Sequence, residues 1–449
     1  MDIAASSAPE EGADSGATGG KPSRKIWKWT ALASMASYID AGSIVAAAAG
    51  LPLWESYLGL GAGTVGLLTA FSSNAISAAI GALIGGRLGD RYGRKRIYAW
   101  DLLVFAFGIL WIVFAVNTPM LFVGYVIVGL AVGADLPTSL ALIAEFSPGR
   151  SRGKLIGLTQ VAWSLGPLVT ALLAFALAPL GLLGVRIVFA HLFVVAVVTW
   201  YLRRSMVESA HWVRARERAR DAGNPVALGR LRDLFTGNNL RALVFTGAIY
   251  VLWNTAAGTA GAFLPYILQR AGNADQATSV GIQVLNYALT MLAVAFGFMQ
   301  LADGRRRRTV FAAGSLMQVA AFGCFVFLPI GTGVAVANVA LFGIGAAFAG
   351  ESFYKLWSQE MFPTMLRATA QGLTFAFARI FLGFWSLLVP LMIASSFGVA
   401  GMSAIMMGML VLFSVIGLLG MPDSAGRSLG ELEQGPSTPG TAEGVESNR

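Results

Sequence analysis

Asp40 is an informative charged residue in this sequence, because it lies deep inside a long apolar stretch. It follows Lys28 by twelve residues, which is about 18 Å along a helix at 1.5 Å per residue. A carboxylate at that depth in a membrane is costly and needs a partner or a proton. Because an apolar cavity favours its neutral form, Asp40 is a candidate for binding and releasing a proton. The alternative is a structural hydrogen bond to a neighbouring helix.

Further charged residues lie within apolar stretches. Asp135 is a second acid that could share the proton transfer or be structural. Glu351 and Lys355 are four residues apart, so they can pair on one face of a helix. Arg379 then has no obvious partner, and a free cation in a cavity would favour an anionic substrate such as a carboxylate. The alternative is a closed network of Glu351, Lys355 and Arg379 that only fixes helix packing.

The elements that position these residues must cross a membrane. Hydrophobic residues make up 56% of the 449 positions and charged residues 12%, against about 25% charged residues in a soluble domain. Apolar runs of about 20 residues, the length that crosses a bilayer as a helix, predict an all-α membrane protein with twelve spans. They cover about 28–53, 63–86, 97–116, 119–145, 155–179, 183–202, 239–268, 278–301, 309–329, 332–361, 368–394 and 398–421.

The Lys and Arg residues indicate which ends of the spans face the cytoplasm, since cytoplasmic loops carry an excess of positive charge. Of 32 such residues, 28 fall in segments that alternate correctly, and opposite loops such as 51–62 and 117–118 carry none. We therefore expect a multi-pass protein of the cell inner (plasma) membrane with both termini cytoplasmic. The net charge of +9 follows from this topology and gives no reason to expect nucleic acid.

The positions of the apolar spans and of the basic segments divide the chain into five parts. They are a disordered cytosolic tail (1–26), an N-terminal six-helix bundle (27–202), a cytosolic linker (203–238), a C-terminal six-helix bundle (239–421) and a cytosolic tail (422–449). The first residues lack the basic region and cleavage site of a signal peptide. The sequence contains no metal-ligand spacing, P-loop or pairing of nucleophile and base. We expect no metal, no cofactor beyond a coupling proton, and no enzyme.

One pattern occurs twice, 215 residues apart, and gene duplication is its simplest cause. In transporters built from two similar halves, substrate binds between the halves while one rocks against the other. The repeat therefore predicts a transporter of two pseudo-symmetric bundles. The matched residues are Glu145, Pro148, Arg152, Gly157, Leu158 and Thr159 in the first half, and Glu360, Pro363, Arg367, Gly372, Leu373 and Thr374 in the second.

Residues 86–95 predict contacts that close the cytoplasmic end. They read Gly-Arg-Leu-Gly-Asp-Arg-Tyr-Gly-Arg-Lys between spans two and three. Glycines allow a tight turn between helices, and an aspartate with arginines can join neighbouring helix ends by charge-assisted hydrogen bonds. A solvated basic loop is the alternative. The candidate gate residues of this segment are Gly86, Asp90, Arg91, Gly93 and Arg94.

A shorter form of this segment, Asp303-Gly304-Arg305-Arg306, occupies the equivalent loop of the second half, 213 residues after Asp90. Contacts at the cytoplasmic ends of both halves suit an outward-open state and must break when the protein opens inward. The further candidate gate residues are Glu145, Arg152, Asp303, Arg305, Glu360 and Arg367.

These motifs resemble those of the major facilitator superfamily, and within it the sugar porters and their metabolite:proton symporter relatives. The resemblance covers about 28–433 and implies two six-helix bundles around a cavity lined by spans 1, 4, 7 and 10. Residues 37–42 and 353–372 look most like bacterial inositol transporters. The other matching segments are 86–95, 145–152, 207–212, 360–367 and 426–431.

The resemblance implies roles for individual residues. Tyr38-Ile39-Asp40 is similar to the first-span motif whose aspartate is the proton-coupling site. Gln160 falls where sugar porters bind sugar hydroxyls with a glutamine, and an amide offers both a donor and an acceptor to a polyol. The arginine that pairs with the aspartate in span four is replaced by Tyr125, so the coupling pair is incomplete.

Spans seven and ten also depart from the sugar porters. Leu252 and Trp253 stand at the paired glutamines of span seven, with Asn254 beside them, while Glu351 and Lys355 replace a glycine and a sugar-stacking tryptophan in span ten. Tryptophans could supply an aromatic face instead, or only pack. The candidate substrate-binding residues are Tyr38, Gln160, Trp163, Trp253, Asn254, Glu351, Lys355, Trp357 and Arg379.

We therefore expect a proton-coupled importer of a small hydroxylated metabolite, a sugar or a cyclic polyol such as inositol, acting as a monomer in the lipid bilayer by alternating access. The nearest alternative is an importer of an organic or aromatic acid anion that uses Lys355 or Arg379. A further alternative is a nutrient receptor that binds its substrate without transporting it.

Overall fold

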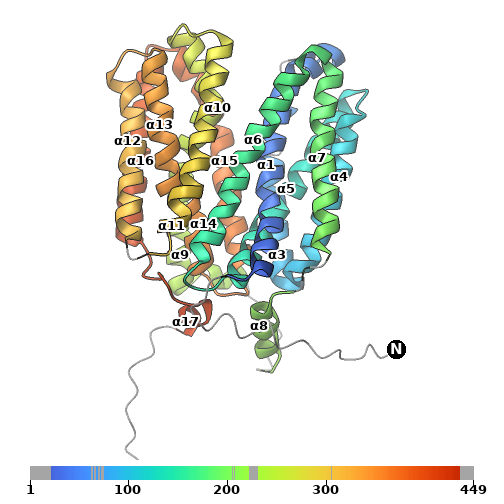
Figure 1. Ribbon diagram of the computed structural model, residues 1–449, viewed down its shortest axis with the longest axis vertical. Coiled ribbons are helices and arrows are strands. Elements are labelled where there is room, and N and C mark those ends of the chain that lie inside the picture. Colours follow the sequence, from blue (N-terminus) through green and yellow to red (C-terminus); the bar gives the residue numbers. More distant parts are fainter. Residues whose placement is uncertain are drawn as a thin grey trace, which may run out of the picture.

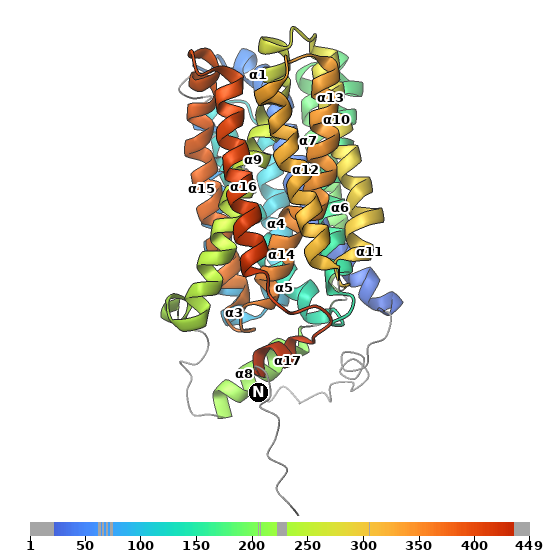
Figure 2. The same ribbon diagram turned by 90° about the vertical axis from the view of Figure 1, so that its left-hand side faces the viewer.

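The computed structural model describes residues 22–434, except 62–63, 65–66, 69–70, 72–74, 205, 207, 222–230 and 305. The described part is helical and contains no strand. Two helix bundles stand side by side, with α1 to α7 in one and α9 to α16 in the other, and the short helices α8 and α17 lie beyond the same end of both bundles (Figures 1 and 2).

The first bundle contains long apolar helices joined by short turns. Its helices are α1 (Arg24–Leu58), α3 (Ile76–Tyr92), α4 (Arg94–Val113), α5 (Thr118–Phe146), α6 (Arg152–Leu177) and α7 (Leu182–Arg203). A 3-10 turn, η2 (Ala178–Leu180), joins the last two. The linker that follows holds α8 (Ala210–Asp221) and η4 (Leu231–Phe235).

The second bundle repeats this pattern with two interruptions. Its helices are α9 (Gly237–Ala271), α10 (Gln276–Ala293), the π-helical turn η5 (Val294–Phe298), α11 (Met299–Leu301), α12 (Arg307–Phe327), α13 (Thr332–Ala349), α14 (Glu351–Glu360), α15 (Arg367–Ala394) and α16 (Gly398–Gly420). After it comes α17 (Leu429–Gln434). Within the described residues, eleven helical segments are long and apolar enough to cross a membrane. The predicted second span, 63–86, is described only in part before α3, which has 17 residues.

The predicted tenth span, 332–361, is not one continuous helix. It breaks at Gly350, where the backbone angles are φ −115° and ψ −140°. A Cβ on Gly350 would lie 2.9 Å from the ring of Trp253 on α9, so only glycine fits the approach. The break comes directly before Glu351, which starts α14.

Short polar residues begin several of these helices, as expected for N-caps. The side chain of Asn117 accepts a hydrogen bond from the Met120 N–H at 2.9 Å and begins α5. The side chain of Asp275 accepts one from the Thr278 N–H at 3.2 Å and begins α10.

Two glycines bring the bundles together, because they let α3 pack directly on α15. A Cβ on Gly86 would lie 2.4 Å from the Ala368 carbonyl oxygen, and one on Gly372 would lie 2.2 Å from the Ala82 carbonyl oxygen. Neither distance leaves room for a side chain. Gly93 has a different role: its φ of +102° forms the turn between α3 and α4.

We expect Gly372→Val to destabilise the protein, because overpacking a close helix contact costs about 1–3 kcal/mol. Gly383→Val on the same helix is the matched control, since nothing lies within 4 Å of the Cβ position there. The measurement is the thermal unfolding of both purified variants in detergent. A melting temperature for Gly372→Val equal to that of Gly383→Val would contradict the close α3–α15 contact.

Candidate transport site

Four charged side chains from three helices meet between the bundles. Arg379 of α15 lies with its Nη2 3.7 Å from Oδ2 of Asp40 on α1. On α14, Lys355 Nζ lies 3.6 Å from Oε1 of Glu351. All four residues are buried, with at most 5% of their surface exposed. The electrostatic neighbours of Asp40 include the other three, so the four form one group.

Polar neighbours connect this group to both bundles. Gln160 of α6 accepts a hydrogen bond from Lys355 Nζ at 3.1 Å. The Tyr250 hydroxyl of α9 donates to Glu351 Oε1 at 3.3 Å. We call Asp40, Gln160, Glu351, Lys355 and Arg379 the central cluster.

The central cluster differs from both arrangements considered for its charges. Glu351 and Lys355 do pair as their spacing predicts. Arg379, however, is not left without a partner, and it does not only close a network with Glu351 and Lys355, because it lies beside Asp40. With two carboxylates and two cations, the group has no net charge when all four are ionised.

The tryptophans predicted to line a substrate site divide into two groups. Trp163 lies beside the Asp40 carboxylate, and its ring centroid is 6.3 Å from that of Tyr287 on α10. Trp253 donates to Gln318 Oε1 at 2.8 Å and packs against the Gly350 break. Trp357 is fully buried among Phe245, Phe311 and Phe353 in the second bundle. Phenylalanines cover the Trp357 ring, so in this conformation Trp357 packs inside the second bundle, which is the alternative given for the tryptophans in the sequence.

Several buried amides have polar atoms that make no hydrogen bond within the described part of the chain. They include Nδ2 of Asn254 on α9, a predicted site residue, and Oδ1 of Asn286 on α10. Oδ1 of Asn286 lies against Gly343 of α13, inside the second bundle, since a Cβ on that glycine would be 2.8 Å from it. Asn254 lies one turn after Tyr250 on α9, and its unpaired Nδ2 can donate to a ligand that accepts hydrogen bonds.

Two other candidates point elsewhere. The Tyr38 hydroxyl bonds to Nε2 of His191 on α7 at 3.2 Å, within the first bundle. Asp135 Oδ2 lies 3.1 Å from Arg203 Nη1, and the same nitrogen lies 3.8 Å from Oδ1 of Asp101. Asp135 therefore belongs to a salt bridge of α4, α5 and α7, and its contacts do not include Asp40. The sequence analysis did not identify Arg203 or Asp101.

A second buried cluster closes the end of the bundles near α8 and α17, which is the predicted cytoplasmic end. Arg152 Nη1 lies 3.2 Å from Glu360 Oε1, and Arg367 Nη1 lies 3.3 Å from Glu145 Oε1. Each half thus pairs its arginine with the glutamate of the other half. Because the four residues are the two copies of the 215-residue repeat, the pairs follow the pseudo-symmetry of the fold.

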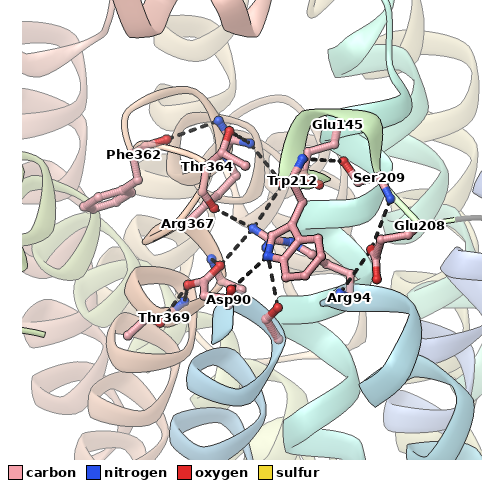
Figure 3. Close-up of polar contacts among 12 residues, drawn as sticks. Asp90, Arg94, Glu145, Glu208, Ser209, Trp212, Phe362, Thr364, Arg367 and Thr369 are labelled. Carbon is pink, nitrogen blue, oxygen red and sulfur yellow. Dashed lines mark hydrogen bonds and ion pairs between the residues drawn. The ribbon is translucent and has the colours of Figure 1, made fainter. Parts of the chain in front are cut away.

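Two aspartates bind the first turns of helices in the opposite half. Asp90 accepts hydrogen bonds from the N–H and the hydroxyl of Thr369 on α15, both at 2.7 Å (Figure 3). Asp303 accepts from the N–H groups of Gly153 at 2.7 Å and Lys154 at 2.9 Å, on α6. A carboxylate is favoured there by the positive end of the helix dipole. Burial nevertheless raises the pKa of Asp303.

Equivalent arginines complete the cluster in each half. Arg94 Nη2 lies 2.8 Å from Asp90 and 3.1 Å from Glu145 (Figure 3). Arg307 Nη2 lies 3.2 Å from Glu360. The offset of 213 that relates Asp90 to Asp303 also relates Arg94 to Arg307, so the sequence contained a signal for Arg307 that was missed. We name the whole set the gate cluster: Asp90, Arg94, Glu145, Arg152, Asp303, Arg307, Glu360 and Arg367.

Two predicted gate arginines are not in this set. Arg91 is exposed, and its guanidinium lies over the Tyr92 ring at 5.3 Å. The prediction that Arg91 is a gate residue is therefore wrong, because its side chain lies at the surface. Arg305 lies outside the described residues.

The linker and the C-terminal segment pack on the gate cluster. Glu208 accepts hydrogen bonds from the N–H groups of Arg94 at 3.2 Å and Lys95 at 3.1 Å, and burial raises its pKa. The Trp212 indole donates to the Asp90 carbonyl oxygen at 2.8 Å (Figure 3). Ser424 donates to Glu360 Oε2 at 2.6 Å. Opening this end must therefore disturb these segments as well.

The two-bundle architecture, the repeat and the buried clusters can now be set beside known proteins. A family profile described as Major Facilitator Superfamily matches residues 30–384, well over half of the chain. The chain belongs to the major facilitator superfamily. It is therefore a membrane transporter and not an enzyme, as the sequence predicted.

Individual relatives support this assignment. The minor myo-inositol transporter IolF of Bacillus subtilis is 42% identical over 410 residues, which is 91% of this chain and 93% of IolF. The glucose transporter GlcP of Staphylococcus epidermidis is 26% identical over 76% of this chain and 82% of its own length. A solved structure of the proton:xylose symporter XylE, 18% identical, has a TM-score of 0.77 and matches 91% of this chain and 98% of its own. The XylE comparison shows the same fold.

We expect Glu360→Arg to open the gate cluster, because it places three arginines together without their shared carboxylate. The double variant Glu360→Arg/Arg152→Glu should close it again by restoring one exchanged pair. The measurement is the distance between spin labels on the α6 and α15 ends in a Cys324→Ser background. Equal distances in the wild type and the single variant would show that the exchanged pairs do not hold this end closed.

Proposed function

We propose that this transporter imports a small hydroxylated metabolite, a cyclic polyol such as myo-inositol or a sugar, together with a proton. The observation that carries the proposal is the central cluster, where a buried carboxylate, Asp40, faces Arg379, and a second cation, Lys355, donates to the amide of Gln160. The 42% identity to a myo-inositol transporter over nearly the whole chain supports the polyol as substrate.

The charge and the polar atoms of the site favour a neutral substrate over an anion. Lys355 and Arg379 each already lie beside a carboxylate, so an acid anion would have to compete with Glu351 or Asp40. A polyol needs uncharged donors and acceptors, which the Gln160 amide and the unpaired Nδ2 of Asn254 can provide.

The transport cycle proposed here uses both clusters. Asp40 takes a proton from outside, and the substrate binds near Gln160, Asn254 and α14. The bundles then rock, the exchanged pairs of the gate cluster separate, and substrate and proton leave to the cytoplasm. The carrier returns with Asp40 ionised. In this cycle the protein acts as a monomer in the inner membrane, with both termini cytoplasmic.

Uptake of radiolabelled myo-inositol into proteoliposomes tests the proposal. We expect an inward proton gradient to drive accumulation in the wild type and Asp40→Asn to reduce it at least tenfold. Counterflow exchange should persist in Asp40→Asn, because a permanently neutral site still binds substrate. Asp275→Asn is the matched control, since this exposed N-cap keeps its capping side chain.

Each alternative function predicts a different result in the same vesicles. Uptake of an aromatic acid without uptake of inositol would assign the site to acid anions bound by Lys355 or Arg379. Inositol binding without uptake would indicate a non-transporting receptor. Uptake of inositol that does not depend on the proton gradient would contradict the proton-coupling role of Asp40 and indicate facilitated diffusion.

A further inference from the structure

The position at which sugar porters are expected to provide a cation for the first-span aspartate holds none in this chain. Tyr125 of α5 stands there, and its buried ring lies edge-on to Phe189 of the first bundle at 6.3 Å between centroids. The structure instead places a cation of the second bundle, Arg379, beside Asp40. The partner of Asp40 is thus on the other side of the interface that must move during transport.

We infer that Arg379 is the coupling partner of Asp40, and that protonation of Asp40 removes an ion pair between the bundles and frees the Arg379 guanidinium for the substrate. This inference rests on the proposed function and deepens it. It reassigns Arg379 from a residue that selects an anionic substrate to a positioning residue for the proton.

Among the described residues around Asp40, none is as well placed as Arg379 to be its partner. Lys355 also acts on Asp40, but it lies 3.6 Å from Glu351 and donates to Gln160. His191 of α7 bonds to Tyr38 and to the Val188 carbonyl oxygen. The titratable and charged groups that act on Asp40 are Tyr250 on α9, Glu351 and Lys355 on α14, and Arg379 on α15, and Tyr354 of α14 acts on Arg379.

The geometry explains how one proton affects both binding and movement. While Asp40 is ionised, Arg379 is held by it, and the two bundles share a buried ion pair. When Asp40 is neutral, the guanidinium keeps its five donors and loses the ion pair to Asp40, while Glu351 still acts on it. The hydroxyls of a polyol can then accept from the guanidinium nitrogen that faced Asp40. Substrate affinity should therefore depend on the proton on Asp40.

Infrared titration of the purified full-length protein tests the pairing without assuming a substrate. The band of the protonated Asp40 carboxyl is identified by its loss in Asp40→Asn. Arg379→Gln removes the cation, so we expect Asp40 to keep its proton to higher pH, and the band should persist at least one pH unit further. Arg379→Lys should titrate near the wild type. Arg186→Gln is the matched control, because Arg186 bonds to the Ala115 carbonyl oxygen away from the central cluster.

Binding of myo-inositol at several pH values tests the consequence for transport. In the wild type the dissociation constant should rise about tenfold per pH unit above the titration of Asp40, as one linked proton requires. In Arg379→Gln the dissociation constant should not change with pH over the same range. Adding Tyr125→Arg to Arg379→Gln should restore the pH dependence.

The outcomes separate the inference from the proposed function. If the Asp40 band titrates at the same pH in Arg379→Gln and the wild type, Arg379 is not the coupling partner and the inference fails. If the band shifts but inositol does not bind, the pairing stands and the proposed substrate is wrong. If Arg379→Gln weakens binding equally at every pH, with the slope unchanged, Arg379 is only a structural or substrate-contacting residue.

Discussion

The arrangement of the whole molecule depends on the exchange of ion pairs between its halves. Arg152 pairs with Glu360 and Arg367 with Glu145, so each half provides an arginine for the glutamate of the other half. At about 3.2 Å and an effective dielectric constant of about 20, one such pair gains roughly 5 kcal/mol in Coulomb energy, but desolvation offsets much of that gain. The pairs therefore select a conformation more than they add stability, since separating the halves takes the partner glutamate from Arg152 and from Arg367, while Arg94 and Arg307 stay beside the glutamates of their own halves.

The central cluster also contains buried ion pairs, and one of them joins the two halves, but these pairs differ from those of the gate cluster. Its pairs are longer, 3.6 and 3.7 Å, and they involve side chains that a proton or a polyol can replace. The gate cluster is instead reinforced by backbone N–H groups bound to Asp90 and Asp303. A ligand can thus rearrange the centre of the interface, while the end of the bundles responds only when the helices themselves move.

The sequence predicted residues that recur at a fixed offset and apolar spans that alternate with basic loops. It did not predict contacts between residues that lie far apart in the sequence. Glu145, Arg152, Glu360 and Arg367 were identified because they recur at a fixed offset, and the fold followed from twelve apolar runs and their basic loops. Which arginine pairs with which glutamate could not be read, because exchange between halves is a property of the packed interface. The partner of Asp40 was missed for the same reason. The break at Gly350 was also missed, since its packing against the Trp253 ring joins residues that are far apart in the sequence.

Helix α14 connects the two clusters and gives the transport cycle a physical link. Its first residue, Glu351, belongs to the central cluster and its last, Glu360, to the gate cluster. Nine residues separate them, about 13 Å along a helix, which is short enough to move as a rigid unit. The break at Gly350 separates α14 from α13, so α14 is a helical segment of its own. One short helix thus carries a residue of each cluster, and any displacement of α14 along its axis would move Glu351 and Glu360 together.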